Sequence, residues 1–160
     1  LGPDVLASQF DRALAADNLR EARGRPICDA LLNQRVLAGL GNVYKSELLF
    51  LTGLHPLRSA ETITAAQAAK LIELAQTLMA SNVGAAADGG IVTYRGLRRT
   101  TRRADTGERL WVYGRAGAPC RKCGSAIASA LLGKDVRRTY WCPHCQPDSQ
   151  ISRPDTSVNR

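Results

Sequence analysis

The sequence has no long apolar run, because no window in it approaches the roughly 18 uninterrupted apolar residues that mark a membrane-spanning helix. It has no leader in which a charged segment precedes an apolar one, no internal repeat and no extended low-complexity tract. We therefore expect no membrane-spanning segment. With 44% hydrophobic and 22% charged residues, the 160 residues have the composition of an ordinary globular chain of one domain or two small ones.

Acidic side chains are scarce in one third of the chain. Residues 95–115 contain seven basic and two acidic side chains, and residues 116–145 contain five and one, whereas residues 1–94 are almost balanced at eight and nine. The net charge of +8 therefore comes from residues 95–145. A basic excess confined to one segment indicates a polyanionic partner such as nucleic acid, although a surface of solvated charges is the alternative.

Apolar residues recur at helical spacing through the N-terminal half, interrupted by glycine and proline. Thr64 and Gln67 form a capping-box pattern ahead of the clearest apolar stripe. These patterns predict four helices, at residues 3–23, 26–38, 43–51 and 64–82.

The character of the sequence changes after Gly84, where a small-residue linker at 85–90 precedes a basic and poorly periodic stretch. Short strands are predicted at 110–113, 126–131 and 137–141, the last two joined as a hairpin by a turn at Gly133-Lys134-Asp135. The chain is therefore predicted to be mainly α-helical, with a helical domain at 1–92, a basic loop at 93–109, a cysteine-bounded finger at 110–146 and a disordered tail at 147–160.

Four of the five cysteines form two close pairs. Two residues separate Cys120 from Cys123 and Cys142 from Cys145, and 18 residues lie between the pairs. This spacing predicts one structural zinc ion held by four thiolates, with no open position for water. Two disulfides are the alternative, but no secretory leader favours them, and no thioredoxin-like unit favours a redox role. The fifth cysteine, Cys28, lies among apolar residues and is expected to pack as a small hydrophobe rather than to react.

Two features predict phosphate contacts. Arg137 and Arg138 lie near the predicted hairpin, where guanidinium groups match phosphate oxygens, although solvated arginines are the alternative. Gly39 and Gly41 permit a tight turn before the helix that begins at Asn42, and the free backbone N–H groups of that helix end attract an anion. A pair of helices packed only for structural reasons explains the same glycines.

Two parts of the sequence are similar to a known family. LLNQRVLAGLGNVYKSELLFLTGLHP, at residues 31–56, closely resembles the helix-two-turn-helix motif of the formamidopyrimidine-DNA glycosylase and endonuclease VIII family. VYGRAGAPCRKCGSAI and RRTYWCPHCQ, at 112–127 and 137–146, resemble the C-terminal zinc finger of the same family. The resemblance covers residues 1–146 and implies a four-helix helix-two-turn-helix domain followed by a small β-hairpin zinc finger.

The resemblance implies a repair enzyme that flips an oxidised base out of double-stranded DNA, cuts its glycosidic bond and nicks the backbone by elimination. By motif, Asn42 and Arg137 are expected to contact phosphates beside the flipped nucleotide, with Gly41 at the same helix start. Arg138 is expected to make the contact of Arg137 if the family motif aligns with this sequence one residue further on. Lys45, one helical turn after Asn42, is expected to reach the DNA backbone, which follows from the helix period and not from the family motif.

Members of this family catalyse with an N-terminal proline and an adjacent glutamate, which belong to a β-rich domain that we expect to be absent from this chain. Pro3 is no substitute, because it follows Gly2 and its nitrogen is a non-nucleophilic amide. The first residue is Leu1 rather than a methionine, so either the ends were processed or the chain is a piece of a longer protein. We expect it to bind DNA without glycosylase or lyase activity.

The substrate and the setting follow only from the resemblance. Gly89-Gly90 is followed by Ile91-Val92-Thr93 and arginines, which favours the endonuclease VIII branch, whose members prefer oxidised pyrimidines. The resemblance also implies a monomer that acts in the cytoplasm on nucleoid DNA. The alternative function is a stand-alone, non-enzymatic zinc-containing nucleic-acid-binding module, since similar helical units and zinc ribbons occur in ribosomal and transcription proteins.

Overall fold

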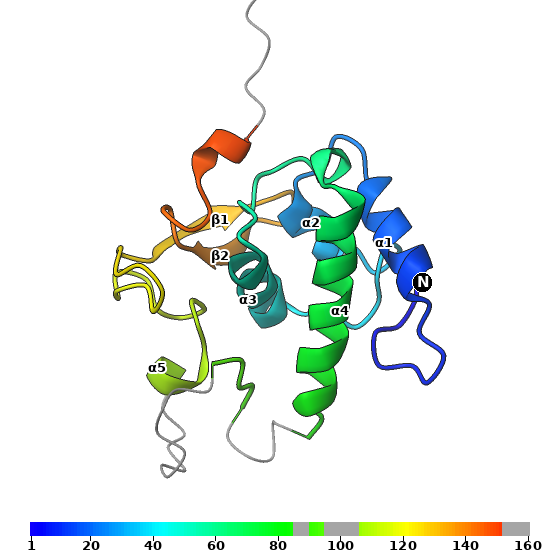
Figure 1. The fold of residues 1–160 in the computed structure, drawn as a ribbon, viewed down its shortest axis with the longest axis horizontal. Helices are drawn as coiled ribbons and strands as arrows, with labels where there is room; N and C mark the ends of the chain where they lie inside the picture. Colours follow the sequence, from blue (N-terminus) through cyan, green and yellow to red (C-terminus); the bar gives the residue numbers. More distant parts are fainter. Residues whose placement is uncertain (85–89, 95–105, 152–160) are drawn as a thin grey trace, which may run out of the picture.

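The computed structural model describes residues 1–84, 90–94 and 106–151. This described part is mainly helical and contains a two-stranded antiparallel hairpin (Figure 1). Among its helices, none is both long enough and apolar enough to cross a membrane. The elements in chain order are α1 (Arg12–Arg20), α2 (Ile27–Leu32), α3 (Asn42–Thr52), η1 (Ala60–Thr62), α4 (Ala65–Ser81), α5 (Thr106–Arg109), β1 (Ala128–Leu132), β2 (Arg137–Trp141) and η2 (Asp148–Gln150).

The third and fourth helices confirm their sequence predictions. α4 begins with the capping box, in which Thr64 Oγ1 accepts the N–H of Gln67 and Gln67 Oε1 accepts the N–H of Thr64. A cap of this kind stabilises a helix by about 1 kcal/mol. α3 ends at Gly53, whose φ of 70° lies in the left-handed region that glycine adopts without strain.

The first helix is shorter than predicted, because the N-terminal segment pairs with another part of the chain. The N–H of Gly2 donates to the carbonyl of Gln34, and the N–H of Ala38 donates to the carbonyl of Pro3. α1 therefore begins only at Arg12. The pairing places the N-terminal segment beside the loop that leads into α3.

The second helix also ends early. α2 stops at Leu32, since Asn33 has an extended ψ of 109° and its side chain accepts the N–H of Arg35 at 3.0 Å. An asparagine that bonds the backbone two residues further on favours a turn over a continuing helix. The loop continues to Gly39, whose φ of 98° is accessible to glycine and strained for other residues.

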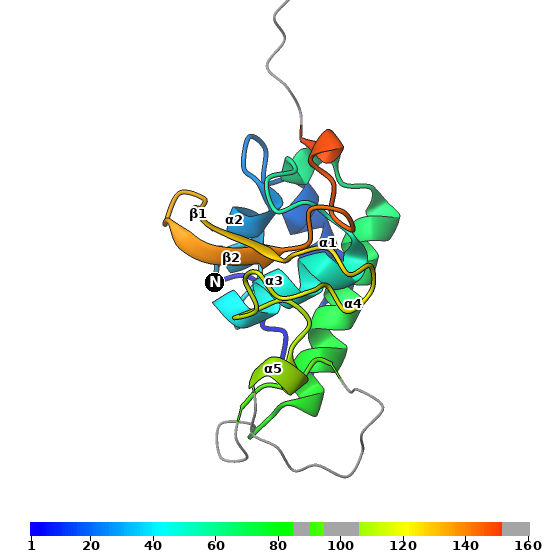
Figure 2. The same ribbon diagram turned by 90° about the vertical axis from the view of Figure 1, so that its left-hand side faces the viewer.

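α3 lies between α4 and the hairpin, as Figures 1 and 2 show. Residues 44–50 of α3 are all buried, so the helix is covered around its whole circumference. Leu48 belongs to the core among the helices, whereas Phe50 packs with Val112 and Ile127 in a second core that includes the buried cysteines of the finger. α3 therefore joins the helical part to the cysteine-containing part.

The predicted hairpin is confirmed, with β1 shifted to residues 128–132. β1 and β2 pair antiparallel in a register that sets Leu131 opposite Arg138 and Leu132 opposite Arg137. The turn includes Gly133, as expected, and closes at Val136, whose φ is 50°. Leu132 packs against the helical core, so the hairpin lies on the helices rather than apart from them.

The predicted disordered tail differs from the structure at its start. Gln150 donates through Nε2 to the carbonyl of Gly53 at 2.8 Å, and its Oε1 accepts the N–H of His55 at 3.1 Å. These bonds hold η2 against the end of α3, which contradicts disorder for residues 148–150. The rest of the predicted tail at 152–160, most of the linker (85–89) and most of the basic loop (95–105) lie outside the described residues.

Candidate nucleic-acid interface

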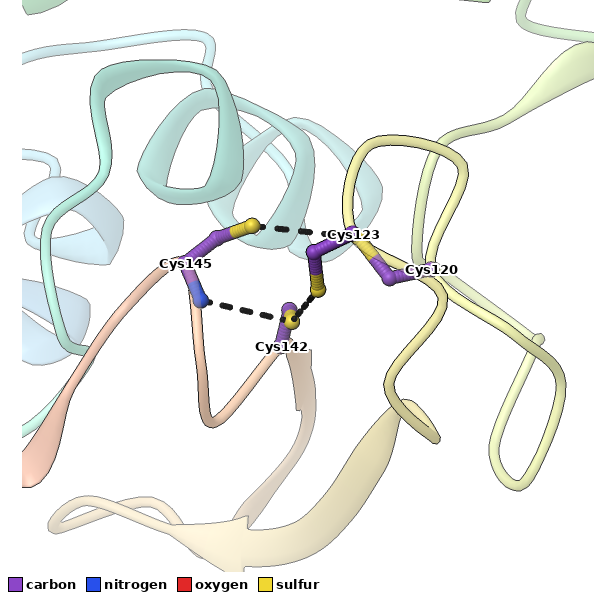
Figure 3. Close-up of side chains that lie close together, drawn as sticks. All are labelled: Cys120, Cys123, Cys142 and Cys145. Carbon is purple, nitrogen blue, oxygen red and sulfur yellow. Dashed lines mark hydrogen bonds between the residues drawn. The ribbon is translucent and has the colours of Figure 1, made fainter.

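The four paired cysteines gather at one point. Figure 3 shows Cys120 and Cys123 on one turn and Cys142 and Cys145 on another, with their side chains directed toward one another. All four Sγ atoms lie within 4.8 Å of each other, at 3.4 Å for Cys123 and Cys142 and 3.9 Å for Cys120 and Cys145. Tetrahedral bonding to one metal at about 2.3 Å requires sulfurs about 3.8 Å apart. The cluster therefore fits a four-thiolate metal site, as predicted.

Backbone N–H groups surround these sulfurs. Cys120 Sγ accepts the N–H of Lys122 at 3.4 Å, and Cys123 Sγ accepts that of Ser125 at 3.5 Å. Hydrogen bonds from Ser125 lower the pKa of the Cys123 thiol from 9.0 to about 6. Such donors stabilise a thiolate, which is the form that binds a metal.

Cys28 lies apart from this cluster in the helical core, where it is 2% exposed. Burial, together with the neighbouring Asp29, raises the pKa of its thiol from 9.0 to about 11. Only a small fraction is thiolate at neutral pH, so Cys28 packs as the small hydrophobe that was predicted.

A buried carboxylate holds the chain just before the first cysteine pair. Glu47 is fully buried, and its carboxylate accepts the N–H groups of Trp111, Val112 and Tyr113 at 2.7, 2.9 and 3.1 Å. The hydroxyl of Thr93 also donates to it. The strand predicted at 110–113 is therefore wrong, because these N–H groups converge on one carboxylate instead of facing a neighbouring strand.

Glu47 was not among the predicted site residues. Its signal in the sequence is the polar triplet Lys45-Ser46-Glu47 inside an otherwise apolar helix, which is unusual unless each polar group has a buried partner. Glu47 bonds Thr93 before the basic segment 95–105 and Trp111 after it. It therefore holds the chain on both sides of that segment against α3.

Side chains of α3 also bond two residues of β2. Asn42 Nδ2 donates to the carbonyl of Arg138 at 3.0 Å, and Ser46 Oγ accepts the N–H of Tyr140 at 3.2 Å. Asn42 Nδ2 further lies 3.4 Å from the hydroxyl of Tyr113. The start of α3 and the hairpin are therefore joined by a series of polar contacts.

The start of α3 keeps open hydrogen-bond donors. The first N–H groups of an α-helix have no partner within the helix. Gly41, which precedes α3, has no side chain that could cap them. Gly41 is exposed and Asn42 is half-buried, as a site for an anion requires. The buried Oδ1 atom of Asn42 has no hydrogen-bond partner, which leaves the amide held through its nitrogen alone.

The two candidate arginines are both exposed but lie on opposite faces of β2. Arg137 shares its face with Thr139, which is buried against α3. Arg138 shares the other face with Tyr140, and its Nη1 atom donates to Ser129 Oγ at 3.4 Å. Arg137 is thus the arginine on the same side as α3.

Lys45 does not lie at the surface. Its side chain is 1% exposed, and its ammonium donates to Thr139 Oγ1 at 2.8 Å and to the carbonyl of Arg138 at 3.5 Å. Burial lowers the pKa of Lys45, and Arg137 lowers it further. The structure contradicts the expectation that Lys45 reaches the DNA backbone, because β2 covers the ammonium.

The tip of the hairpin is held by α2. Both carboxylate oxygens of Asp29 accept the N–H of Lys134, at 3.2 and 3.0 Å. Gly133 lies so close to Asp29 that a β-carbon there would overlap the carboxylate. The hairpin is therefore fixed to the helices at its tip as well as along β2.

Comparison with known families gives a match over more than half of the chain. The family model described as the formamidopyrimidine-DNA glycosylase H2TH domain matches residues 1–94. Endonuclease 8 2 of Mycobacterium bovis is 45% identical over 146 residues, which are 91% of this chain and 52% of that protein. The DNA-(apurinic or apyrimidinic site) lyase Nei2 of Mycolicibacterium smegmatis is 42% identical over 149 residues, or 93% and 54%. The chain spans about half the length of the curated relatives it matches.

Solved structures agree with this match. The complex between Lactococcus lactis Fpg and an abasic site containing DNA has a TM-score of 0.71 and 27% identity, covering 92% of this chain and 52% of that one. MutM (Fpg) from Thermus thermophilus has a TM-score of 0.72 and 34% identity, covering 91% and 53%.

Proposed function

Because the chain belongs to the formamidopyrimidine-DNA glycosylase and endonuclease VIII family, we propose that it is the DNA-binding part of a bifunctional DNA glycosylase and AP lyase of base-excision repair. The whole protein would remove an oxidised base and nick the backbone by β-elimination. The partner is double-stranded DNA that contains a damaged base. An intracellular site of action follows from that substrate.

The observation that carries this proposal is the joint placement of Asn42 and Arg137. Asn42 stands at the uncapped start of α3, where N–H groups attract an anion. Arg137 extends from the neighbouring strand on the same side, with a guanidinium that matches phosphate oxygens. Open helix N–H groups at the start of α3 and a cation on the strand that packs against this helix suit the backbone of one DNA strand.

The metal that the cysteine cluster fits is proposed to be a single structural zinc ion. Four thiolates in tetrahedral arrangement are typical of zinc, and a site filled by four protein sulfurs has no position for a reacting water. Its role is to hold together the two turns that flank the hairpin carrying Arg137, one before β1 and one after β2. The proposal adds no catalytic residue within this chain.

Removal of the base and cleavage of the strand are proposed to depend on residues beyond these 160. Members of the family use an N-terminal proline and a glutamate, whereas Pro3 of this chain follows Gly2, so its nitrogen is an amide and not a free secondary amine. Oxidised pyrimidines are the proposed substrates, in keeping with relatives named Endonuclease 8 2. A monomer is proposed, as the family resemblance implies.

The experiment is to mix the zinc-loaded chain with duplex DNA that contains an oxidised pyrimidine or an abasic site. We expect binding without a strand nick and without a covalent adduct after borohydride reduction. An adduct would show that this chain carries its own nucleophile. This would overturn the proposal that catalysis depends on residues beyond these 160. Absence of any binding would overturn the DNA-binding role itself. A chain that binds intact and damaged duplexes equally and gains no activity with a family catalytic domain would favour the stand-alone module.

A further inference from the structure

Lys45 is a buried cation without a carboxylate partner among the described residues. It is 1% exposed, and the hydrogen-bond partners of its ammonium are the neutral Thr139 hydroxyl and the Arg138 carbonyl. Asp29 is near enough to favour the charged form but forms no ion pair with it. A buried charge that lacks a partner of opposite sign usually destabilises a fold, so its presence here calls for a role other than packing.

The bonds of Lys45 lead to both candidate phosphate contacts. The Arg138 carbonyl that accepts from Lys45 also accepts from Asn42 Nδ2, at 3.0 Å. The Thr139 hydroxyl that accepts from Lys45 donates in turn to the carbonyl of Arg137, at 3.2 Å. One ammonium therefore bonds the acceptor that orients the Asn42 amide and the hydroxyl that bonds the backbone of Arg137.

The same bonds show which groups depend on Lys45. Without it, the Arg138 carbonyl keeps its bond from Asn42, and the Thr139 hydroxyl keeps its bond to Arg137. Removal of the ammonium therefore leaves neither group unpaired, and a methionine of similar length would fill the space. What is lost is the direct link between the two bonds, whereas the bonds of Asn42 and Ser46 still hold β2 against α3.

We propose that Lys45 is a positioning residue for DNA binding, which holds Asn42 and Arg137 in mutual register from beneath β2 without touching DNA. This inference rests on the proposed function. Lys45 was expected to contact the DNA backbone directly. In this proposal it acts indirectly, through the Arg138 carbonyl and the Thr139 hydroxyl.

A double-mutant cycle tests it. The zinc-loaded chain, Lys45→Met, Asn42→Ala and the double variant are titrated against a fluorescent duplex, and thermal unfolding is followed for each. Lys45→Met is expected to weaken binding about fivefold, the size of one net hydrogen bond, with an unchanged or raised melting temperature. In the Asn42→Ala background the same substitution is expected to change affinity less than about twofold, because Lys45 acts partly through Asn42. Lys70→Met, an exposed lysine of α4, is the matched control.

Two results would overturn the inference. Affinity of Lys45→Met equal to that of Lys70→Met would show that the buried ammonium does not influence DNA binding. A fivefold loss of affinity on adding Lys45→Met to Asn42→Ala would show that Lys45 acts independently of Asn42, as expected for a general structural role. If Lys45→Met does not fold, the same cycle is run with Lys45→Gln. Normal binding by both Asn42→Ala and Arg137→Ala would instead refute the proposed interface, which separates the two failures.

Discussion

The carboxylate of Glu47 lies 2.9 Å from the backbone nitrogen of Val112, and both residues are fully buried. A helix of the N-terminal half thus supplies the hydrogen-bond acceptor for the chain that leads into the cysteine cluster. With Phe50 in the core beneath the cysteines, this bond makes α3 part of the finger as well as of the helical domain.

Substitution Glu47→Gln is expected to lower the free energy of unfolding by about 2 to 4 kcal/mol, because an NH2 group would face backbone donors that need an acceptor. Urea denaturation monitored by circular dichroism measures the change. Glu73→Gln makes the same chemical change at an exposed position of α4 and should stay within about 0.5 kcal/mol of the parent chain. Equal effects of the two substitutions would contradict the part given to Glu47.

Removal of the metal is expected to unfold the finger before the helices. Both tryptophans, Trp111 and Trp141, lie between residues 110 and 146, so tryptophan emission reports on this part and on its packing against Phe50 and His55. A chelator should shift that emission to longer wavelength while most of the helical circular dichroism remains, since bound metal supplies folding free energy. Cys28→Ala should respond to the chelator as the parent chain does. Loss of both signals in a single step would show that α3 and α4 need the metal too.

Gly133→Ala tests the contact between the hairpin tip and α2. A β-carbon at Gly133 would overlap the Asp29 carboxylate, and the φ of 84° adds backbone strain. Gly24 has a similar φ of 70°, but no atom lies within 4 Å of the place that a β-carbon would occupy there, so Gly24→Ala measures the backbone strain alone. We expect about 1 kcal/mol of destabilisation at Gly24 and about 2 to 3 kcal/mol at Gly133 in thermal or urea unfolding. Equal losses would mean that the tip moves freely away from Asp29.

His55 predicts a pH dependence of stability. Its Nδ1 atom accepts the N–H of Leu57 at 3.0 Å, its ring packs against Trp141, and burial lowers its pKa from 6.5. The unfolded chain therefore binds more protons between the lowered pKa and 6.5, so His55 makes stability fall as pH drops below 6.5. In His55→Asn, an acceptor remains but does not titrate. The stability difference between the parent chain and this variant should shrink as pH falls from about 7.5 to about 5, and a constant difference would contradict the assignment.

The sequence was sufficient where a feature depends on neighbouring residues. The capping box of Thr64, the helix start at Asn42 and the four-cysteine spacing each involve short stretches of chain, and the structure contains them as predicted. The late start of α1 could not be predicted in this way. It depends on pairing between the N-terminal segment and the loop before α3, which are about 30 residues apart.

The largest differences concern buried polar groups. Lys45 lies at a helical position that favours a surface contact, and only the packing of β2 on α3 shows that its ammonium is covered. Glu47 gave a weak signal, because its four donors come from residues 93 and 111–113. Local patterns find residues that act at the surface, whereas partners distant in sequence decide which charged groups are buried.

The most direct test of the proposed interface is the salt dependence of duplex binding by Arg137→Ala. Removal of one phosphate contact should weaken binding to all sequences and reduce the slope of log affinity against log salt by about 1. Arg12→Ala removes an exposed arginine of α1, remote from β2, and should leave the slope unchanged. Asn42→Ala should weaken binding with a smaller change in slope, because the amide is neutral. If Arg137→Ala keeps the affinity and slope of Arg12→Ala, the start of α3 and β2 do not form the DNA-binding surface.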